Sequence, residues 1–350
     1  MSERAVEIRP LAAGDLPALS RFLTAGFGAP ADAEFAAPDV LRWKYLDARG
    51  DEPDPSPRSF VATDEAGAIV GHVGFAPTAF AGPGLASPVP ALHMIDWLGS
   101  REHRAVGASL MRRAHEAAPA QIGLGGSDAG RSVIRRGGYE SMPPVTVHER
   151  VLRPFRRLRA VGTSPGEAAR AVRDVARRLA RPPRPATVRL DLEPVASFGP
   201  EVREVVAGAA RHAVVAARTP DRLDDLLRYP RRPASACVFR SPDGKARGLA
   251  ILATLPRGRM VLGRVVDLLL DDADPATWHA ALLLAAAELT RLGADVAQAF
   301  AAPPWTIEAL RRAGFVPRHP LEFRLRDRRG LLPRDVPYYL TPIEADYAFG

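Results

Sequence analysis

The chain lacks several features that would each mark a particular class of protein. Its single cysteine, Cys237, excludes an internal disulfide, and the apolar residues around it favour a buried, unreactive thiol. No group of Cys and His residues has metal-ligand spacing. The longest apolar run, residues 280–287, is much shorter than the about 20 residues that span a bilayer, and residues 1–9 lack a signal-peptide core. We therefore expect a cytoplasmic protein with no bound metal and no membrane contact.

The chain also has almost no lysine, although its net charge is +8. Lys44 and Lys245 are the only two, so nearly all of the positive charge is arginine. Together with abundant Ala, Gly and Pro, this bias indicates a GC-rich, bacterial coding genome more than selection for a nucleic acid. The charge still favours anionic ligands. A length of 350 residues, with 47% hydrophobic and 25% charged residues, fits a globular protein of two domains.

Residues 93–111 hold the most informative pattern in the sequence. An apolar strand-like run is followed by a short polar turn with Arg104 and Gly107, and then by a helix with Leu110 and Met111 on one side. The first amides of a helix have no partner within it, and the helix dipole makes this end positive. Gly107 lets a ligand approach the backbone closely because it has no Cβ. The turn therefore predicts a binding site for a phosphate group.

The run Arg104-x-x-Gly107-x-Ser109 resembles the Arg/Gln-x-x-Gly-x-Gly/Ala loop of the GCN5-related N-acetyltransferase (GNAT) family. Ser109 stands at the position where the family prefers Gly or Ala. The resemblance implies that this loop grips the pyrophosphate of acetyl-coenzyme A. It also implies that the pantetheine arm pairs with the preceding strand. The cofactor residues expected on this basis are Trp97, Leu98, Gly99, Arg104, Ala105, Val106, Gly107, Ala108 and Ser109.

The order of the predicted elements also resembles that of the GNAT family. A strand, two helices, a β-hairpin, a strand, a helix, a strand and a helix follow one another over residues 6–139. The fold class expected is α/β, with two tandem GNAT-like domains. Each would have a mixed, mostly antiparallel central sheet with splayed parallel strands, flanked by helices.

The second half repeats the first with a long period, which predicts a duplication. For example, Pro220-Asp221 and its helix match Pro38-Asp39, and residues 265–268 match residues 94–97. We expect an acetyl-CoA-binding domain at residues 1–150, an Arg-rich helical linker at 151–186, and a degenerate GNAT-like domain with a closing tail at 187–350.

The second copy has no phosphate loop. Its carboxylates Asp271, Asp272 and Asp274 stand where that loop would be, and they would repel a pyrophosphate. We therefore expect the cofactor only in the first half. The arginines of residues 150–185 could bind nucleic acid or anionic lipid headgroups. We expect a solvated connecting helix instead, because no aromatic residues alternate with them.

Two residues of the first half are candidates for the base that deprotonates the acceptor amine. Some GNAT relatives place a Glu on the central strand before the loop, and the resemblance puts His93 at that position. Asp96 is the competitor, since a carboxylate in an apolar strand is costly unless it is paired or used. Its counterpart Asp267 lies in the copy without a loop, which favours a structural role. Ile134 stands at the position where many relatives have the Tyr that acts as general acid.

The sequence thus predicts an N-acetyltransferase that moves an acetyl group from acetyl-CoA to a primary amine of a small molecule or an amino sugar. The alternative is a non-catalytic pair of GNAT domains that binds acyl-CoA or a partner protein, as the missing Tyr would allow. No pattern identifies the acceptor or indicates an oligomeric state.

Overall fold

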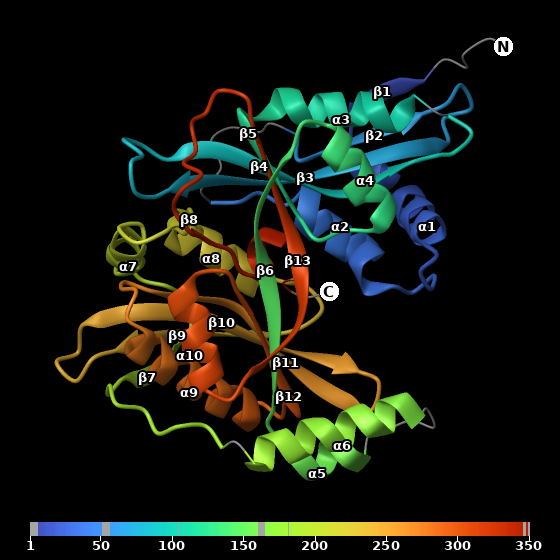
Figure 1. Cartoon of the computed structure of the whole chain (residues 1–350). Helices are drawn as coiled ribbons and strands as arrows, with labels where there is room; N and C mark the ends of the chain where they lie inside the picture. The colour runs from blue at the N-terminus through green and yellow to red at the C-terminus, as the bar shows by residue number, and fades with distance from the viewer. Residues whose placement is uncertain are drawn as a thin grey trace.

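The two halves of the chain build the same kinds of element in a similar order (Figure 1). The computed structural model describes residues 6–50, 57–103, 105–159, 165–180, 182–345 and 348. The main elements of the first half are β1 (Glu7–Pro10), α1 (Leu16–Phe27), α2 (Pro38–Tyr45), β2 (Ser59–Thr63), β3 (Ile69–Ala81), β4 (Val89–Gly99), α3 (Val106–Ala117), β5 (Ala120–Leu124), α4 (Asp128–Arg136) and β6 (Glu140–Val151).

Helices α5 (Pro154–Arg159) and α6 (Pro165–Ala180) link the halves. The second half comprises β7 (Asp191–Val195), α7 (Val202–Ala209), β8 (Val214–Ala216), α8 (Pro220–Leu227), β9 (Ala234–Arg240), β10 (Ala246–Arg257), β11 (Met260–Leu270), α9 (Pro275–Arg291), β12 (Val296–Ala301), α10 (Pro304–Arg312), β13 (Val316–Asp327), β14 (Tyr338–Tyr339) and the 3₁₀ helix η3 (Pro342–Ala345). No helix among the described residues has the length and apolarity needed to cross a bilayer.

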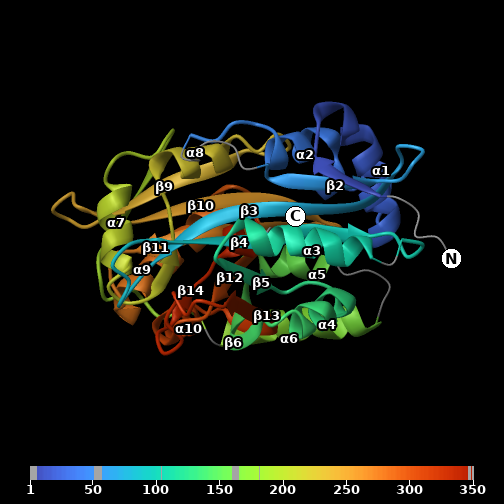
Figure 2. The same ribbon diagram turned by 90° about the horizontal axis from the view of Figure 1, so that it is seen from above.

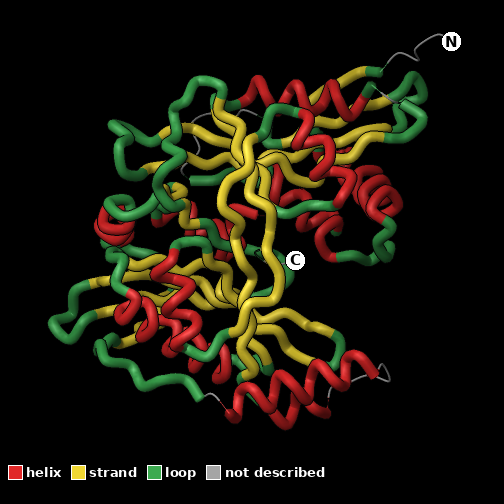
Figure 3. The backbone as a smooth tube through the Cα atoms, viewed as in Figure 1, coloured by secondary structure: helices red, strands yellow, loops and turns green. Residues whose placement is uncertain are grey.

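The last long strand of each half lies in the sheet of the other half. β13 pairs with β5 of the first half, and β6 pairs with β12 of the second half. The two exchanged strands also pair with each other, so one sheet runs β1-β2-β3-β4-β5-β13-β6-β12-β11-β10-β9-β7. Figure 3 shows these two strands passing between the halves. The sequence analysis had expected a separate central sheet in each half, and the exchange joins the two into one.

Helices cover both faces of the first half's strands (Figure 2). On one face, α1 and α2 bury Leu19, Leu23 and Leu41 against Ile95 of β4. On the other face, α3 packs Leu110 and its neighbours against β3 and β4. The buried residues of each helix recur at intervals of three and four, which places them on one side of the helix. β4 therefore lies between two apolar layers.

The parallel strands β4 and β5 are paired over a short stretch and then diverge. Their paired residues are Ala91 with Ala120, Leu92 with Gln121, and His93 with Ile122. Beyond His93, a β-bulge displaces β4, and Asp96 has a φ of 48°. Among the described residues other than glycine, only Asp96 has positive φ. β11 and β12 of the second half are likewise paired only at residues 262–264 and 296–298.

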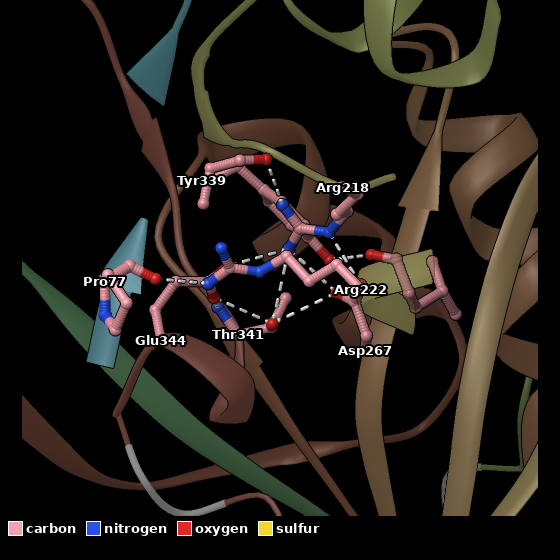
Figure 4. A network of polar contacts seen from close by, with 9 residues as sticks. Pro77, Arg218, Arg222, Asp267, Tyr339, Thr341 and Glu344 are labelled. Carbon is pink, nitrogen blue, oxygen red and sulfur yellow. Dashed lines mark hydrogen bonds and ion pairs between the residues drawn. The ribbon is translucent and has the colours of Figure 1, made fainter. Parts of the chain in front are cut away.

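In the second half, the C-terminal segment packs along the divergent part of β11. Arg218 donates two hydrogen bonds to Asp267, of 2.6 and 2.8 Å, and one of 3.0 Å to Glu344 of η3 (Figure 4). Thr341 donates to the same carboxylate of Asp267 at 3.0 Å, and the Tyr339 hydroxyl donates to the carbonyl of Leu268. Burial opposes the charge of Arg218, but Asp267 and Glu344 outweigh it and raise the pKa of Arg218. This ion-pair network fastens the tail to the second half.

The buried network predicts a large loss of stability when its cation is removed. In Arg218→Met, the carboxylates of Asp267 and Glu344 stay buried without their partner, so the free energy of unfolding should fall by about 3–5 kcal/mol in urea denaturation. The solvent-accessible pair of Arg240 with Glu193 provides the control, and Arg240→Met should leave the free energy of unfolding nearly unchanged. Equal losses in the two variants would contradict the structural role of Arg218.

Candidate functional site

A cavity of about 550 Å³ lies beside the turn that leads into α3. Four residues singled out from the sequence line it, namely Trp97, Gly99, Gly107 and Ala108. Other parts of α3 and Val133 of α4 complete its wall. The cavity is therefore on the α3 face of β4, at the end of that strand, beyond the residues that pair with β5.

Close packing between the end of β4 and the turn shapes this cavity. A Cβ atom on Gly99 would lie 3.0 Å from the backbone nitrogen of Gly107 and 3.2 Å from its Cα. Only glycine at position 99 lets the turn approach the strand so closely. Trp97 also holds the turn, since its indole nitrogen donates to the carbonyl of Gly107 at 3.1 Å. The end of β4 thus fixes the position of the turn relative to the sheet.

The backbone of the turn presents amide donors to the cavity. The amide of Val106 donates to the carbonyl of His103 at 3.0 Å. The next two amides, of Gly107 and Ala108, have no hydrogen-bond partner among the described residues. Both belong to the first turn of α3, where the helix dipole is positive. This arrangement suits an anionic group.

The remaining cofactor residues expected from the sequence lie around this turn. Ala105 is the N-cap of α3, and the amide of Ser109 donates to its carbonyl at 3.0 Å. The side chain of Val106 is buried in the core, and that of Leu98 points to the opposite face, against α1. Arg104 lies outside the described residues.

His93 occupies the last paired position of β4 before the strands diverge. Its side chain is buried, and Nδ1 has no hydrogen-bond partner among the described residues. Burial lowers the pKa of His93 to about 4, and the backbone of Glu344 and the charge of Asp96 only partly offset this effect. The imidazole is therefore neutral at pH 7, and its buried Nδ1 has no partner among the described residues.

Asp96 is held by several groups at the bulge. Its carboxylate accepts hydrogen bonds from Lys44 at 3.1 Å and from the Tyr45 hydroxyl at 2.6 Å. His72 Nδ1 donates to its carbonyl at 2.8 Å, so His72 Nε2 accepts from the Ser59 hydroxyl. Burial alone would raise the pKa of Asp96, but Lys44 and Tyr45 outweigh it and lower the pKa. Such a carboxylate is a weak base, and its contacts stabilise the positive φ of the bulge.

A second cavity, of about 80 Å³, lies between the two halves on the other face of β4. Ile95 and Phe75 line it together with Trp43 and Lys44 of α2. The second half contributes Arg222, Leu226 and Tyr229, and the tail contributes Ile343 and Ala348. By volume it holds about five water molecules, or a small group of similar size.

The duplication predicts an acceptor site between the two halves, but the sequence does not identify the residues that line this second cavity. Contacts between the two halves hold its walls: the Trp43 indole donates to the carbonyl of Asp225 at 3.1 Å, and the Tyr229 hydroxyl donates to Glu34 at 2.7 Å. Arg222 also donates to the carbonyl of Pro77 at 2.7 Å (Figure 4). One sequence signal was present, because the helices at residues 38–45 and 220–227 are counterparts in the duplication. That symmetry brings them face to face.

Residues near α4 do not supply an obvious acid. Ile134 packs close to Gly123 of β5. Tyr139 is buried with its hydroxyl 3.4 Å from Nε2 of His115, and burial raises the pKa of Tyr139 to about 12. Ser127 caps α4 by accepting from the amide of Gly130 at 3.2 Å.

The turn that precedes α9 in the second half does not repeat the geometry of the turn that precedes α3. Arg247 binds Asp271 at 2.9 Å and Asp272 at 2.8 Å, and Asp274 caps α9. Helix α7 covers this turn so closely that a Cβ on Gly208 would lie 2.6 Å from Cβ of Asp271.

No family model and no curated protein matches this sequence. Solved structures with a similar fold include a GCN5-related N-acetyltransferase from Anabaena variabilis (14% identity, 92% of this chain and 73% of that chain, TM-score 0.61). N-myristoyltransferase of Saccharomyces cerevisiae with bound myristoyl-CoA is also similar (14%, 93% and 83%, 0.58). Eis1 of Mycobacterium abscessus is a third (16%, 92% and 73%, 0.51). These likenesses confirm the fold class predicted from the sequence.

The buried histidines predict a dependence of stability on pH. The pKa of His93 is near 4 in the folded chain and near 6.5 when the side chain is exposed, so its contribution is present above pH 6.5 and is lost as the pH falls toward 4. His93→Gln should make the free energy of unfolding less steep in pH by about 1.4 kcal/mol per unit between these values. An unchanged slope in His93→Gln would refute the buried neutral state.

Proposed function

We propose that this chain, which has the GNAT fold in two copies, is an N-acyltransferase whose active site lies in the first half. The donor would be acetyl-CoA, and the acceptor a primary amine of a small molecule or an amino sugar. One observation carries the proposal: β4, whose pairing with β5 ends at His93, has the donor-rich turn and its cavity on one face and the cavity between the halves on the other.

The α3 cavity suits the coenzyme. Amides of Gly107 and Ala108 would bind the pyrophosphate, and the unpaired edge of β4 beyond His93 would pair with the pantetheine arm. The thioester would then reach the place where the strands separate. A backbone amide of β4 could polarise its carbonyl, as an oxyanion donor does. Residues Trp97 and Gly99 would position the turn without touching the reacting atoms.

The cavity between the halves suits the acceptor. The amine nitrogen would attack the thioester carbon, and the C–S bond would break. The proton that the nitrogen loses on becoming an amide would go to the leaving thiolate. The ammonium of the acceptor must first lose a proton to become a nucleophile, and His93, which is neutral and has an unpartnered Nδ1 among the described residues, would accept that proton. Asp96 would act as a positioning residue, since Lys44 and Tyr45 already hold its carboxylate.

The non-catalytic reading remains the second candidate, because Ile134 stands where many GNAT enzymes have their acid. It predicts acyl-CoA binding without thiol release. Measuring thiol release against a panel of small primary amines and amino sugars separates the two, since only an enzyme releases coenzyme A faster than the uncatalysed rate.

The location of the cofactor predicts the effect of one substitution in the turn. Gly107→Glu would place a carboxylate among the free amides, so titration calorimetry with acetyl-CoA should show at least a hundredfold weaker binding than in the unchanged chain. Ala117→Glu, exposed at the far end of the same helix, adds the same charge and should bind normally. Normal binding by Gly107→Glu would place the coenzyme elsewhere.

The role of His93 predicts a loss of turnover without a loss of coenzyme. If it removes the proton, His93→Ala should lower kcat by about 10²-fold or more while acetyl-CoA binding stays within a factor of two. Asp96→Asn, in contrast, should act mainly by lowering stability. A fall of less than threefold in His93→Ala would leave the histidine only a packing role.

A further inference from the structure

A third cavity, of about 1010 Å³, lies in the second half between α6, α10 and the strands β6 and β13. Arginines line it on all of these elements. They include Arg150 of β6, Arg178 of α6, Arg312 of α10 and Arg318 of β13, with Arg184 from the segment after α6. Its size is that of pockets that bind small molecules.

The carboxylates in this cavity are already paired. Arg318 binds Asp174 through two hydrogen bonds of 3.0 and 2.9 Å, and it binds Glu149 at 2.9 Å. Glu149 also accepts from Arg257 at 2.6 Å. Arg312 is paired with Glu308 at 2.8 Å. These pairs hold α6 against the sheet, and they leave no described carboxylate of the lining to neutralise the other arginines.

Two guanidinium groups in the cavity have buried donors without acceptors. Nε and Nη1 of Arg150 and Nε of Arg178 are shielded from solvent and have no hydrogen-bond partner among the described residues. Burial and the charge of Arg178 lower the pKa of Arg150 to about 10. Burial and the charges of Arg312, Arg150 and Arg184 also lower the pKa of His279. Unpaired buried donors and like charges at close range both destabilise the folded chain.

We propose that this cavity binds a small anion that bears phosphate groups, held by Arg150 and Arg178. A phosphate oxygen pair matches the planar fork of a guanidinium and accepts several charge-assisted hydrogen bonds at once. Such an anion would supply the missing acceptors and offset the repulsion between the two arginines. The phosphate could belong to a free small molecule or to a lipid headgroup, which share this chemistry.

The buried position of the donors favours a small anion over a nucleic acid. A nucleic-acid backbone is bound along an exposed positive track, whereas the unpaired atoms of Arg150 and Arg178 lie inside a cavity. The site is also separate from the turn at Gly107, because it is built from α6, α10 and the two exchanged strands. The inference therefore does not depend on the proposed acyl transfer.

Pyrophosphate is the probe for the free anion, titrated by calorimetry into the full chain at low salt. The Gly107→Glu variant is titrated in parallel, because it removes binding at the α3 turn. Introduced into either protein, Arg150→Gln and Arg178→Gln should each weaken the binding of pyrophosphate to this cavity at least tenfold. Arg170→Gln, on an exposed part of α6 outside the cavity, is the matched control and should bind as the parent does.

A lipid arm uses vesicles of phosphatidylcholine with and without phosphatidic acid. Binding that needs phosphatidic acid and is lost in Arg150→Gln and Arg178→Gln supports the proposal and assigns the phosphate to a lipid. Without any anion, the same two variants should unfold at the same temperature as the parent or higher, because each removes a repelling charge. A lower unfolding temperature would mean that these arginines stabilise the empty fold and would contradict the proposal.

Three other results would overturn it: no binding of pyrophosphate or of phosphatidic acid vesicles, binding that the two variants leave unchanged, or binding only of an oligonucleotide with a steep salt dependence.

Discussion

The hydrogen bonds of Lys44 and Tyr45 to Asp96 are the constraint on which the site depends. A residue other than glycine with positive φ is strained, and these buried contacts stabilise it. The bulge that results turns β4 away from β5 immediately after His93. Without that divergence, the edge of β4 would be paired with β5, and no strand would be open to a pantetheine arm.

The second half has a corresponding aspartate beside a bulge, without the positive φ, and the result is different. Asp267, the counterpart of Asp96, is paired with Arg218 next to a bulge at Val266. There the C-terminal segment packs against the strand through Thr341 and Glu344, and α7 covers the following turn. One duplicated framework thus leaves an opening in the first half and fastens the tail in the second. The exchange of β6 and β13 fixes the two halves together, so that a cavity can form between them.

The sequence predicted the elements that lie within one stretch of the chain. It did not predict the contacts that join distant segments. The strand, turn and helix at residues 93–111 lie in one stretch, so their local structure could be anticipated. The sequence did not indicate that Trp97 and Gly99 hold the turn at Gly107. The exchange of β6 and β13 could not, because both strands have the same pattern and either pairing satisfies it. The duplicated aspartates indicated a structural role for Asp96, although nothing in the sequence named Lys44 as its partner. The Arg-rich linker at residues 151–186 was expected to be a solvated helix, whereas Nε of Arg178 is buried.

The central claim is that coenzyme A binds to the first half through the turn at Gly107 and the open edge of β4. A crystal structure of the full chain with coenzyme A tests it most directly. The account predicts the pyrophosphate on the amides of Gly107 and Ala108, with the thiol between β4 and β5 near His93. Coenzyme A bound against β11 in the second half, or a turn at Gly107 closed by side chains, would contradict it.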